Sequence, residues 1–265
     1  MIHPVTTPGM PHGPIRRVGS TVERHARVTS TNDLARDRLE SPDSEGLVIV
    51  ADEQTAGRGR RGRSWISPPG TNLYVSVALH PRIGSADAWQ LGIATALAAA
   101  SACGAVAPVA LKWPNDVVAA DGRKIGGLLV ETIAEGDRLR GAVLGIGINV
   151  NWRREAMPAE IRDTATSLAD LAGGDVDREL LLGRLVDALA TEIEAVESGE
   201  SPLPRYRERC ATLGAAVRVA TADGVVTGRA IDLDPTGALV VEGGDGDVRV
   251  LATGEVLGVR PESAS

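Results

Sequence analysis

The sequence VALKWPNDVVAADGRKIGGLLVE at residues 109–131, followed by LRGAVLGIGINV at residues 139–150, decides the fold of this chain. Its apolar runs are interrupted by Pro114 and by the dipeptide Asp121-Gly122, which is a frequent hairpin turn. Short apolar runs between turn signals are typical of β-strands. The pattern predicts four strands of a mixed sheet, at residues 109–113, 116–118, 124–131 and 139–150.

The last of these strands carries Gly145, Gly147 and Asn149 at alternate positions. Alternate side chains of a strand point to the same face, so these three residues share one face of the sheet. Two glycines and one amide leave room for a flat ligand against that face. A closely packed helix would fit the same face, and both interpretations stay open at this point.

An apolar run, LVIVA at residues 47–51, predicts a strand that is buried on both faces. It leads into GRGRRGRSW at residues 57–65, which holds four arginines and three glycines. The whole chain has a formal charge of −7, so this cationic loop indicates a local need to bind an anion. We expect the loop to be mobile when empty and ordered by an anionic ligand. The alternatives are a solvated surface loop and a nucleic-acid-binding patch.

Helices and a small barrel complete the predicted organisation. Residues 30–39 begin with Ser-Thr-Asn-Asp, which is typical of a capped helix start, and further helices are expected at residues 85–102, 164–171 and 178–196. From residue 215 onward, five short strands between Gly- and Asp-rich turns indicate a small barrel. The expected divisions are a flexible arm at residues 1–19, a main domain at residues 20–213 and the barrel at residues 214–265.

The composition argues against several classes of protein. Hydrophobic residues make up 43% of the chain, which is enough for a core, but Phe is absent and the packing must be aliphatic. Cys103 and Cys210 form neither a disulfide framework nor a zinc motif. The sequence has no long uncharged apolar run and no signal-peptide core, so we expect a cytoplasmic protein without a membrane span. The negative net charge argues against a nucleic-acid-binding protein.

Several common motifs are missing from the chain. Gly145-x-Gly147 lacks the third glycine of the dinucleotide fingerprint, and neither a P-loop nor a Gly-x-Ser-x-Gly elbow occurs. Lys112, Asp116 and Lys124, beside a cationic loop, suit phosphate binding with a divalent metal. Mg²⁺ takes one or two carboxylates plus phosphate oxygens, so Asp116 is the candidate ligand. A turn formed by Asp116 with Asn115, and a solvated strand end at Lys124, are the alternatives.

Five segments resemble biotin protein ligases (biotin–[acetyl-CoA-carboxylase] ligases) in both order and spacing. They are STN at 30–32, QTAGRGRRGRSW at 54–65, KWPND at 112–116, KIGGLLVE at 124–131 and GIGINVN at 145–151. The resemblance implies an α+β fold, in which a mixed β-sheet flanked by helices, like that of class II aminoacyl-tRNA synthetases, is followed by a small C-terminal SH3-like β-barrel. It also implies the short class of ligase without an N-terminal DNA-binding domain, so no DNA partner is expected.

The chemistry that the resemblance implies has two steps. Biotin and ATP, with Mg²⁺, give biotinyl-5′-AMP, and a lysine of a biotin carboxyl carrier domain then accepts the biotin. The implied catalytic residues are Lys124 and Arg60, and the implied Mg²⁺ ligand is Asp116. The implied contacts to biotin or its adenylate are Ser30, Thr31, Asn32, Gln54, Gly57, Arg58, Gly59, Arg60, Lys124, Gly126 and Gly127. The implied nucleotide contacts are Arg61, Arg63, Trp65, Lys112, Asn115 and Asn149.

Two rival functions remain. A lipoyl or octanoyl ligase has a related fold and the same acyl-transfer logic, although Gln54 and the loop that ends in Trp65 favour biotin. A non-catalytic module would use the cationic loop to hold RNA or an acidic partner. Such a module has no need for the set Lys112, Asp116 and Lys124.

Overall fold

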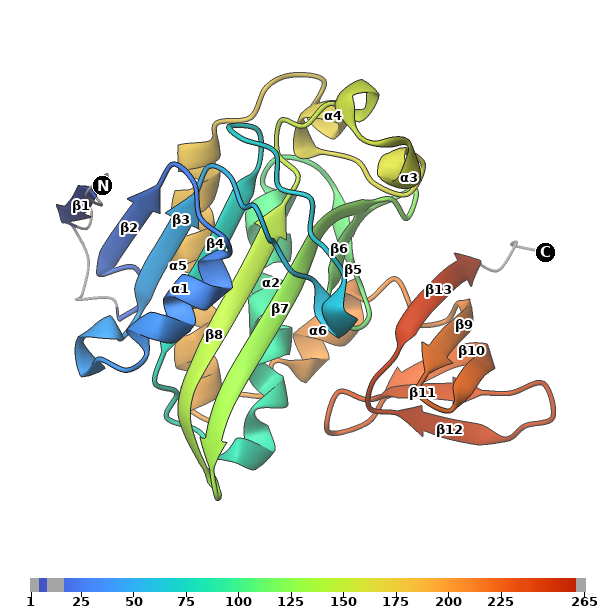
Figure 1. The fold of residues 1–265 in the computed structure, drawn as a ribbon. Coiled ribbons are helices and arrows are strands. Elements are labelled where there is room, and N and C mark those ends of the chain that lie inside the picture. Colours follow the sequence, from blue (N-terminus) through green and yellow to red (C-terminus); the bar gives the residue numbers. More distant parts are fainter. Residues whose placement is uncertain (1–4, 9–16, 261–265) are drawn as a thin grey trace.

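The main body of the molecule is built on one large sheet. A computed structural model describes residues 5–8 and 17–260. The sheet has eight strands in the order β1-β2-β3-β4-β8-β7-β6-β5 (Figure 1). Of the described strands in this sheet, β2 and β3 pair in parallel and the other neighbours pair antiparallel. The strands are β1 (Val5–Pro8), β2 (Thr21–His25), β3 (Leu47–Ala51), β4 (Leu73–Leu79), β5 (Val109–Lys112), β6 (Asp116–Ala119), β7 (Lys124–Glu135) and β8 (Arg138–Ile148). The predicted mixed sheet is therefore confirmed.

Helices cover both faces of the sheet. The helix α1 (Thr31–Arg38) packs on one face, and α2 (Trp89–Gly104) and α5 (Arg178–Glu197) pack together on the other (Figure 1). Successive residues of β3 explain this arrangement, because Ile49 belongs to the apolar cluster under α1 while Val48 and Val50 belong to the cluster under α2 and α5. All five residues of β3 are buried, as the continuous apolar run predicts.

Two predicted helices differ from the observed ones. The helix expected at residues 85–102 is split into the 3₁₀ turn Ser85–Asp87 and α2, which runs on to Gly104. The helix expected at residues 164–171 begins only at α4 (Leu168–Ala172), where the Ser167 hydroxyl accepts a hydrogen bond from Asp170 N. The preceding residues are held in extended form, because Lys124 N donates to Thr164 O and Thr166 N donates to Lys124 O. The short helix α3 (Ala159–Arg162) was not predicted.

A second sheet of five antiparallel strands follows in the order β12-β11-β10-β9-β13 (Figure 1). Its strands are β9 (Ala216–Thr221), β10 (Gly224–Leu233), β11 (Leu239–Glu242), β12 (Val248–Leu251) and β13 (Glu255–Arg260). It is joined to the main body through α6 (Leu203–Arg209). Trp113 Nε1 donates to Gly237 O at 3.0 Å, and Arg207 Nε lies 2.8 Å from Asp232 Oδ1, so both contacts fix the small sheet to the main body.

The N-terminal arm predicted at residues 1–19 falls mostly outside the described residues. Within the described part, Val5–Pro8 pairs antiparallel with β2 and extends the sheet. Cys103 and Cys210 are buried free thiols. Among residues 5–8 and 17–260, no helix combines the length and the apolar character needed to cross a membrane.

Candidate active site

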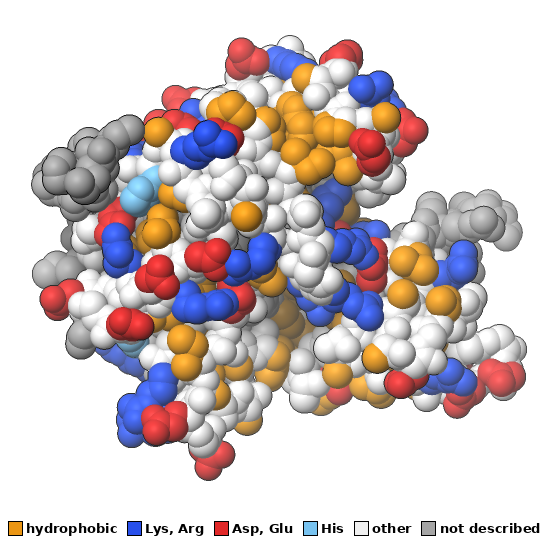
Figure 2. Space-filling model, viewed as in Figure 1, with side chains coloured by type: hydrophobic (Ala, Val, Ile, Leu, Met, Phe, Trp, Pro, Cys, Tyr) orange, Lys and Arg blue, Asp and Glu red, His pale blue; other side chains and the backbone are white. Residues whose placement is uncertain are grey.

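A pocket of ≈ 700 Å³ lies where the cationic loop meets the main sheet and the small sheet. Lys and Arg side chains gather on this face, between the main body and the C-terminal sheet (Figure 2). Most of the predicted site residues line it: Ser30, Thr31, Asn32, Gln54, Arg58, Gly59, Arg60, Arg61, Arg63, Trp65, Lys112, Asn115, Asp116, Lys124, Gly127 and Asn149. Gly57 and Gly126 are not part of the lining. The structure thus brings together residues that are up to 119 positions apart, from Ser30 to Asn149.

The cationic loop is a hairpin with its own backbone hydrogen bonds. Trp65 N donates to Gly57 O at 2.8 Å, and Gly59 N donates to Arg63 O at 2.7 Å. At the tip Arg61 has φ 59°, a left-handed conformation that is uncommon for a residue with a side chain. A Cβ on Gly57 would lie 2.5 Å from Trp65 O, so glycine is required there by the stem of the hairpin rather than by a ligand.

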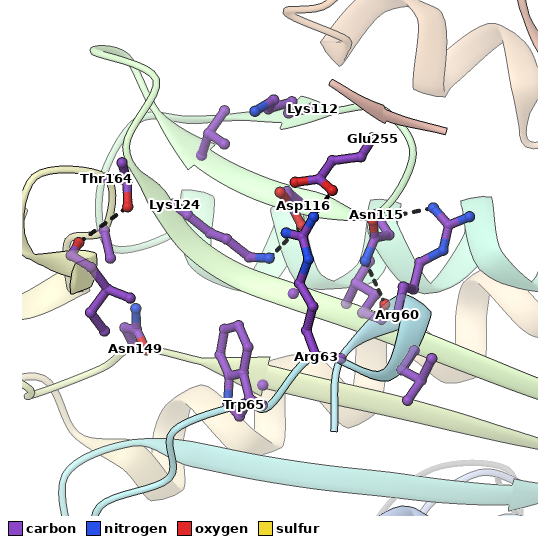
Figure 3. Close-up of a pocket in the computed structure, with 18 of the residues that line it drawn as sticks. Arg60, Arg63, Trp65, Lys112, Asn115, Asp116, Lys124, Asn149, Thr164 and Glu255 are labelled. Atoms are coloured by element: carbon purple, nitrogen blue, oxygen red, sulfur yellow. Dashed lines mark hydrogen bonds and ion pairs between the residues drawn. The ribbon is translucent and has the colours of Figure 1, made fainter. Parts of the chain in front are cut away.

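Glycines of β7 and β8 form one surface of the pocket, and Trp65 lies against it (Figure 3). A Cβ on Gly147 would lie 2.6 Å from Trp65 Nε1, and a Cβ on Gly127 would lie 3.0 Å from Trp65 Cζ3. Lys124 Nζ is 5.2 Å from the centre of the Trp65 ring, within the range of a cation–π contact. Trp65 Nε1 is buried and finds no hydrogen-bond partner among the described residues. We call this surface the glycine floor.

Gly145 makes room for a packed helix, which was the second interpretation of this face. A Cβ on Gly145 would clash with the Asn32 side chain of α1, so here the missing side chain admits a helix. Asn32 Nδ2 donates to Glu131 Oε2 at 2.7 Å, and Ser76 Oγ donates to Asn32 Oδ1 at 2.6 Å. The helix interpretation of the face is therefore confirmed at Gly145, whereas Gly147 faces Trp65 and the flat ligand stays a prediction there.

The polar end of the pocket is built around the start of α1. The side-chain cap expected from the Ser-Thr-Asn-Asp stretch is wrong, because Ser30 at the cap position makes no such bond. Instead Thr31 N and Thr31 Oγ1 both donate to Gln54 Oε1, at 2.9 and 3.1 Å. Gln54 Nε2 donates to Ser67 Oγ at 3.0 Å, and Ser76 Oγ lies 2.8 Å from Thr31 Oγ1. These groups form a buried set of donors and acceptors that can read a polar ligand.

Charged side chains occupy the other end of the pocket (Figure 3). Lys124 Nζ forms an ion pair with Asp116 Oδ1 at 2.7 Å. Burial lowers the pKa of Lys112, and burial likewise lowers the pKa of the Arg60 guanidinium, although Asp116 opposes both shifts. Arg60 Nη1 is 3.4 Å from Asn115 Oδ1. Partly desolvated cations of this kind are a suitable environment for an anion.

The loop arginines are not equivalent. Arg58 Nη1 pairs with Asp33 Oδ1 at 2.7 Å, at the start of α1. Arg63 pairs with Glu255 of β13, and Arg61 Nη1 donates to Ala220 O at 3.1 Å. Arg60 makes one long hydrogen bond, to Asn115, toward which its side chain extends (Figure 3), and the Asp116 carboxylate opposes the lowering of its pKa.

The protein groups alone do not make a metal cage. In the described part of the chain, no group of three or more His, Cys, Asp or Glu side chains is arranged to hold an ion. Asp116 offers one carboxylate, which already carries Lys124. This donor set fits a Mg²⁺ ion that is held mainly by the phosphate oxygens of a nucleotide and takes one carboxylate from the protein.

Several lining residues were missed by the sequence reasoning. Trp152, Ile161 and Ala165 form an apolar wall together with Met157. The signal for Trp152 was its place directly after the segment 145–151. Ser76 is not part of the lining but bonds to Thr31 and Asn32, and it could have been found as the one serine in the buried strand LYVSVAL. Glu255 carries no local signal, because its partner Arg63 is remote in sequence.

Comparison with known families shows which class of protein has this sheet, loop and glycine floor. Residues 24–149 match the model of the Biotin/lipoate A/B protein ligase family, and residues 212–257 match the Biotin protein ligase C terminal domain. A biotin--[acetyl-CoA-carboxylase] ligase from Mycobacterium tuberculosis is 36% identical over 244 residues, which cover 89% of this chain and 88% of that protein. The ligase of the same name from Paracoccus denitrificans is 34% identical over 239 residues, covering 88% and 98%.

A solved structure agrees with these sequence matches. The biotin protein ligase from Aquifex aeolicus in complex with biotin and ATP superposes with a TM-score of 0.72 at 30% identity, covering 91% of this chain and 99% of that one. The chain described here belongs to the biotin protein ligase family. The small C-terminal sheet fits the SH3-like domain expected from the sequence.

Proposed function

We propose that this pocket joins biotin to ATP as biotinyl-5′-AMP and then transfers biotin to a lysine of the biotin carboxyl carrier domain of an acyl-CoA carboxylase. The observation that carries the proposal is the Lys124–Asp116 pair beside the glycine floor, with a buried polar set at one end and partly buried cations at the other. One end suits an uncharged polar ring, and the other suits phosphates. The family membership supports biotin over lipoate as the acid.

The first half-reaction needs the acid and the nucleotide to meet at Lys124. The biotin ureido group pairs with Thr31 and Gln54, whose donors and acceptors already face one another. The biotin carboxylate oxygen attacks the α-phosphorus of ATP, the P–O bond to the β-phosphate breaks, and pyrophosphate leaves. Lys124 stabilises the negative charge that develops there, with Asp116 holding its ammonium in place.

The nucleotide lies against the cations of the pocket. Lys112 and Arg60 are half-buried cations whose desolvation the Asp116 carboxylate only partly offsets, so both gain from a nearby phosphate. Asn115, Asn149, Arg61 and Arg63 complete this end, and Trp65 covers the bound group. Mg²⁺ neutralises phosphate charge when bound, and Asp116 is the residue that would hold it.

The second half-reaction transfers biotin to the carrier. The ε-amine of the carrier lysine attacks the carbonyl carbon of the mixed anhydride, the bond to the phosphate oxygen breaks, AMP leaves, and the amine loses a proton. The mixed anhydride hydrolyses readily in water, so it must be covered until the amine arrives. The loop at residues 57–65, which we propose closes over the anhydride, supplies that cover, and its residues Arg58 and Arg60 contact the bound group.

The chain divides into parts with separate roles in this proposal. Residues 20–213 are the catalytic domain, to whose sheet β1 is added, and residues 214–265 are the small barrel. We also place the enzyme in the cytoplasm, where ATP is available and where Cys103 and Cys210 would stay reduced.

Pyrophosphate exchange tests the proposal. Purified protein should exchange label between pyrophosphate and ATP only when biotin, ATP and Mg²⁺ are all present, and lipoate should not replace biotin. Lys124→Ala should abolish the exchange, while Arg138→Ala, at the exposed start of β8, should leave it at the wild-type rate. Exchange that persists in Lys124→Ala would remove this residue from the mechanism. Exchange with lipoate instead of biotin would favour the lipoyl ligase.

A further inference from the structure

The tip of the cationic loop contacts the C-terminal sheet at two points. Arg61 Nη1 donates to Ala220 O of β9 at 3.1 Å, and the Arg63 guanidinium forms an ion pair with the Glu255 carboxylate of β13 (Figure 3). Ala220 and Glu255 are direct partners in the register of β9 and β13. Both contacts therefore fall on one spot of the small sheet, which we call the loop dock.

The loop dock is not what attaches the small sheet to the main body. That attachment uses other groups, including Trp113 Nε1 on Gly237 O at 3.0 Å and the Arg207–Asp232 pair at 2.8 Å. Gly254, just before Glu255, packs tightly within the small sheet, since a Cβ there would lie 2.5 Å from Val219 Cγ1, and it lies in ordinary contact range of Trp113. The small sheet is thus attached independently of the loop, and Glu255 meets a loop that is also held by its own hairpin bonds and by the Arg58–Asp33 pair.

The negative charge of Glu255 suits it to pair with the cationic loop. Glu255 is an acid at the rim of a pocket whose charged groups are mostly cations. Its side chain is 30% exposed and that of Arg63 is 59% exposed, so the pair is accessible and able to open. An ion pair of this kind contributes modestly, and its rupture frees the loop without disturbing the core.

We propose that Glu255 is a positioning residue that holds Arg63 and so keeps the loop closed over the acyl-adenylate. The C-terminal sheet thereby takes part in retention of the reactive intermediate. The inference rests on the proposed function, because it names what the closed loop retains. It adds a role for the small sheet that the glycine floor and the polar end of the pocket do not need.

Release of the intermediate measures the effect. Protein is loaded with labelled biotin and ATP, freed of excess ligand, and the loss of labelled adenylate is followed over time. Glu255→Gln should release it about 1.5- to 5-fold faster, the range expected for a partly exposed ion pair. The double variant Arg63→Ala/Glu255→Gln should release it no faster than Arg63→Ala. Asp232→Asn, which weakens the contact of the small sheet with Arg207 of α6 away from the loop, should match the wild type.

A second readout needs no ligand. Trypsin should cut the loop of Glu255→Gln faster than that of the wild type, and the exchanged pair Arg63→Glu/Glu255→Arg should restore resistance toward the wild-type rate. If the effects of Arg63→Ala and Glu255→Gln on adenylate release add in the double variant, Glu255 does not act through Arg63 and its role is overturned. The role is also overturned if Glu255→Gln changes neither release nor cleavage. A wild-type protein that forms no adenylate refutes the proposed function, whereas the trypsin result separately decides whether Glu255 holds the loop.

Discussion

Gly147→Ala is the sharpest perturbation of the glycine floor. An added Cβ would lie 2.6 Å from Nε1 and Cε2 of Trp65, whereas ordinary contact begins at 3.4 Å. The indole ring must therefore retreat by about 0.8 Å, the difference between these two distances. Trp65 ends a loop and is only partly buried, so the ring can move. Gly147 does not have a positive φ, so alanine meets no backbone strain there.

The energetic consequence should appear in ligand binding rather than in folding. We expect the free energy of unfolding to change by less than ~1 kcal/mol, because the displaced group is a loop side chain. A methyl group on a surface that receives a flat ligand is an overpacking defect of about 1–3 kcal/mol. That range corresponds to roughly 5- to 150-fold weaker binding of the biotin–nucleotide pair.

The matched control is Gly183→Ala. Gly183 lies inside α5, and a Cβ there would meet nothing within 4 Å. The same chemical change should stabilise the protein by about 0.5–1 kcal/mol and leave binding unchanged. Calorimetric titration with biotin, pyrophosphate exchange and thermal unfolding measure the two variants side by side. Wild-type affinity in Gly147→Ala would show that the glycine floor is not the ligand surface. Equal losses in both variants would show that the effect is not local.

Three further predictions follow from the same geometry. Gly145→Ala should lower the free energy of unfolding by about 1–3 kcal/mol, because its methyl group meets the hydrogen-bonded Asn32; urea unfolding at the wild-type midpoint would contradict this. Arg60→Gly should release adenylate roughly 10- to 150-fold faster, by loss of one charged hydrogen bond, and should biotinylate bystander proteins; no increase over wild type would argue against this role. Burial lowers the pKa of Lys112 in the folded state. Below that lowered pKa the charged ammonium destabilises the folded state, and this destabilisation disappears as the pH rises toward the unfolded pKa of roughly 10.4. Lys112→Met should accordingly be more stable than wild type at pH 7, with the gain shrinking by pH 10, and a gain that does not depend on pH would refute this assignment.

The strands and the glycine floor were predictable because they depend on local periodicity. A strand period of two places Gly145 and Gly147 on one face whatever lies opposite, and the structure keeps that placement. Periodicity does not say what approaches each position. The sequence left a ligand and a helix as alternatives, and α1 with Asn32 meets Gly145 while Trp65 meets Gly147.

The start of α1 was misread for a related reason. Ser30 has the residue type and the extended backbone of a capping residue, but its side chain makes no capping bond. Thr31 is drawn into a set with Gln54 and Ser76, which lie 23 and 45 positions away. Local propensity cannot reveal such partners, because they meet only when β3, β4 and α1 are packed. Most residues that line the pocket were recognisable in the sequence, but their hydrogen-bond partners were not.

The four arginines of the loop show most clearly what a count of charges leaves out. Arg58 and Arg63 already have carboxylate partners in Asp33 and Glu255, so an incoming phosphate gains little from them without breaking an existing pair. Arg60 is half buried with one long contact to an amide, and burial lowers its pKa. The Asp116 carboxylate offsets this desolvation only in part, and an incompletely compensated charge has the most to gain when an anion arrives. Affinity for the nucleotide should therefore depend more on Arg60 than on its three neighbours, although the sequence presents all four alike.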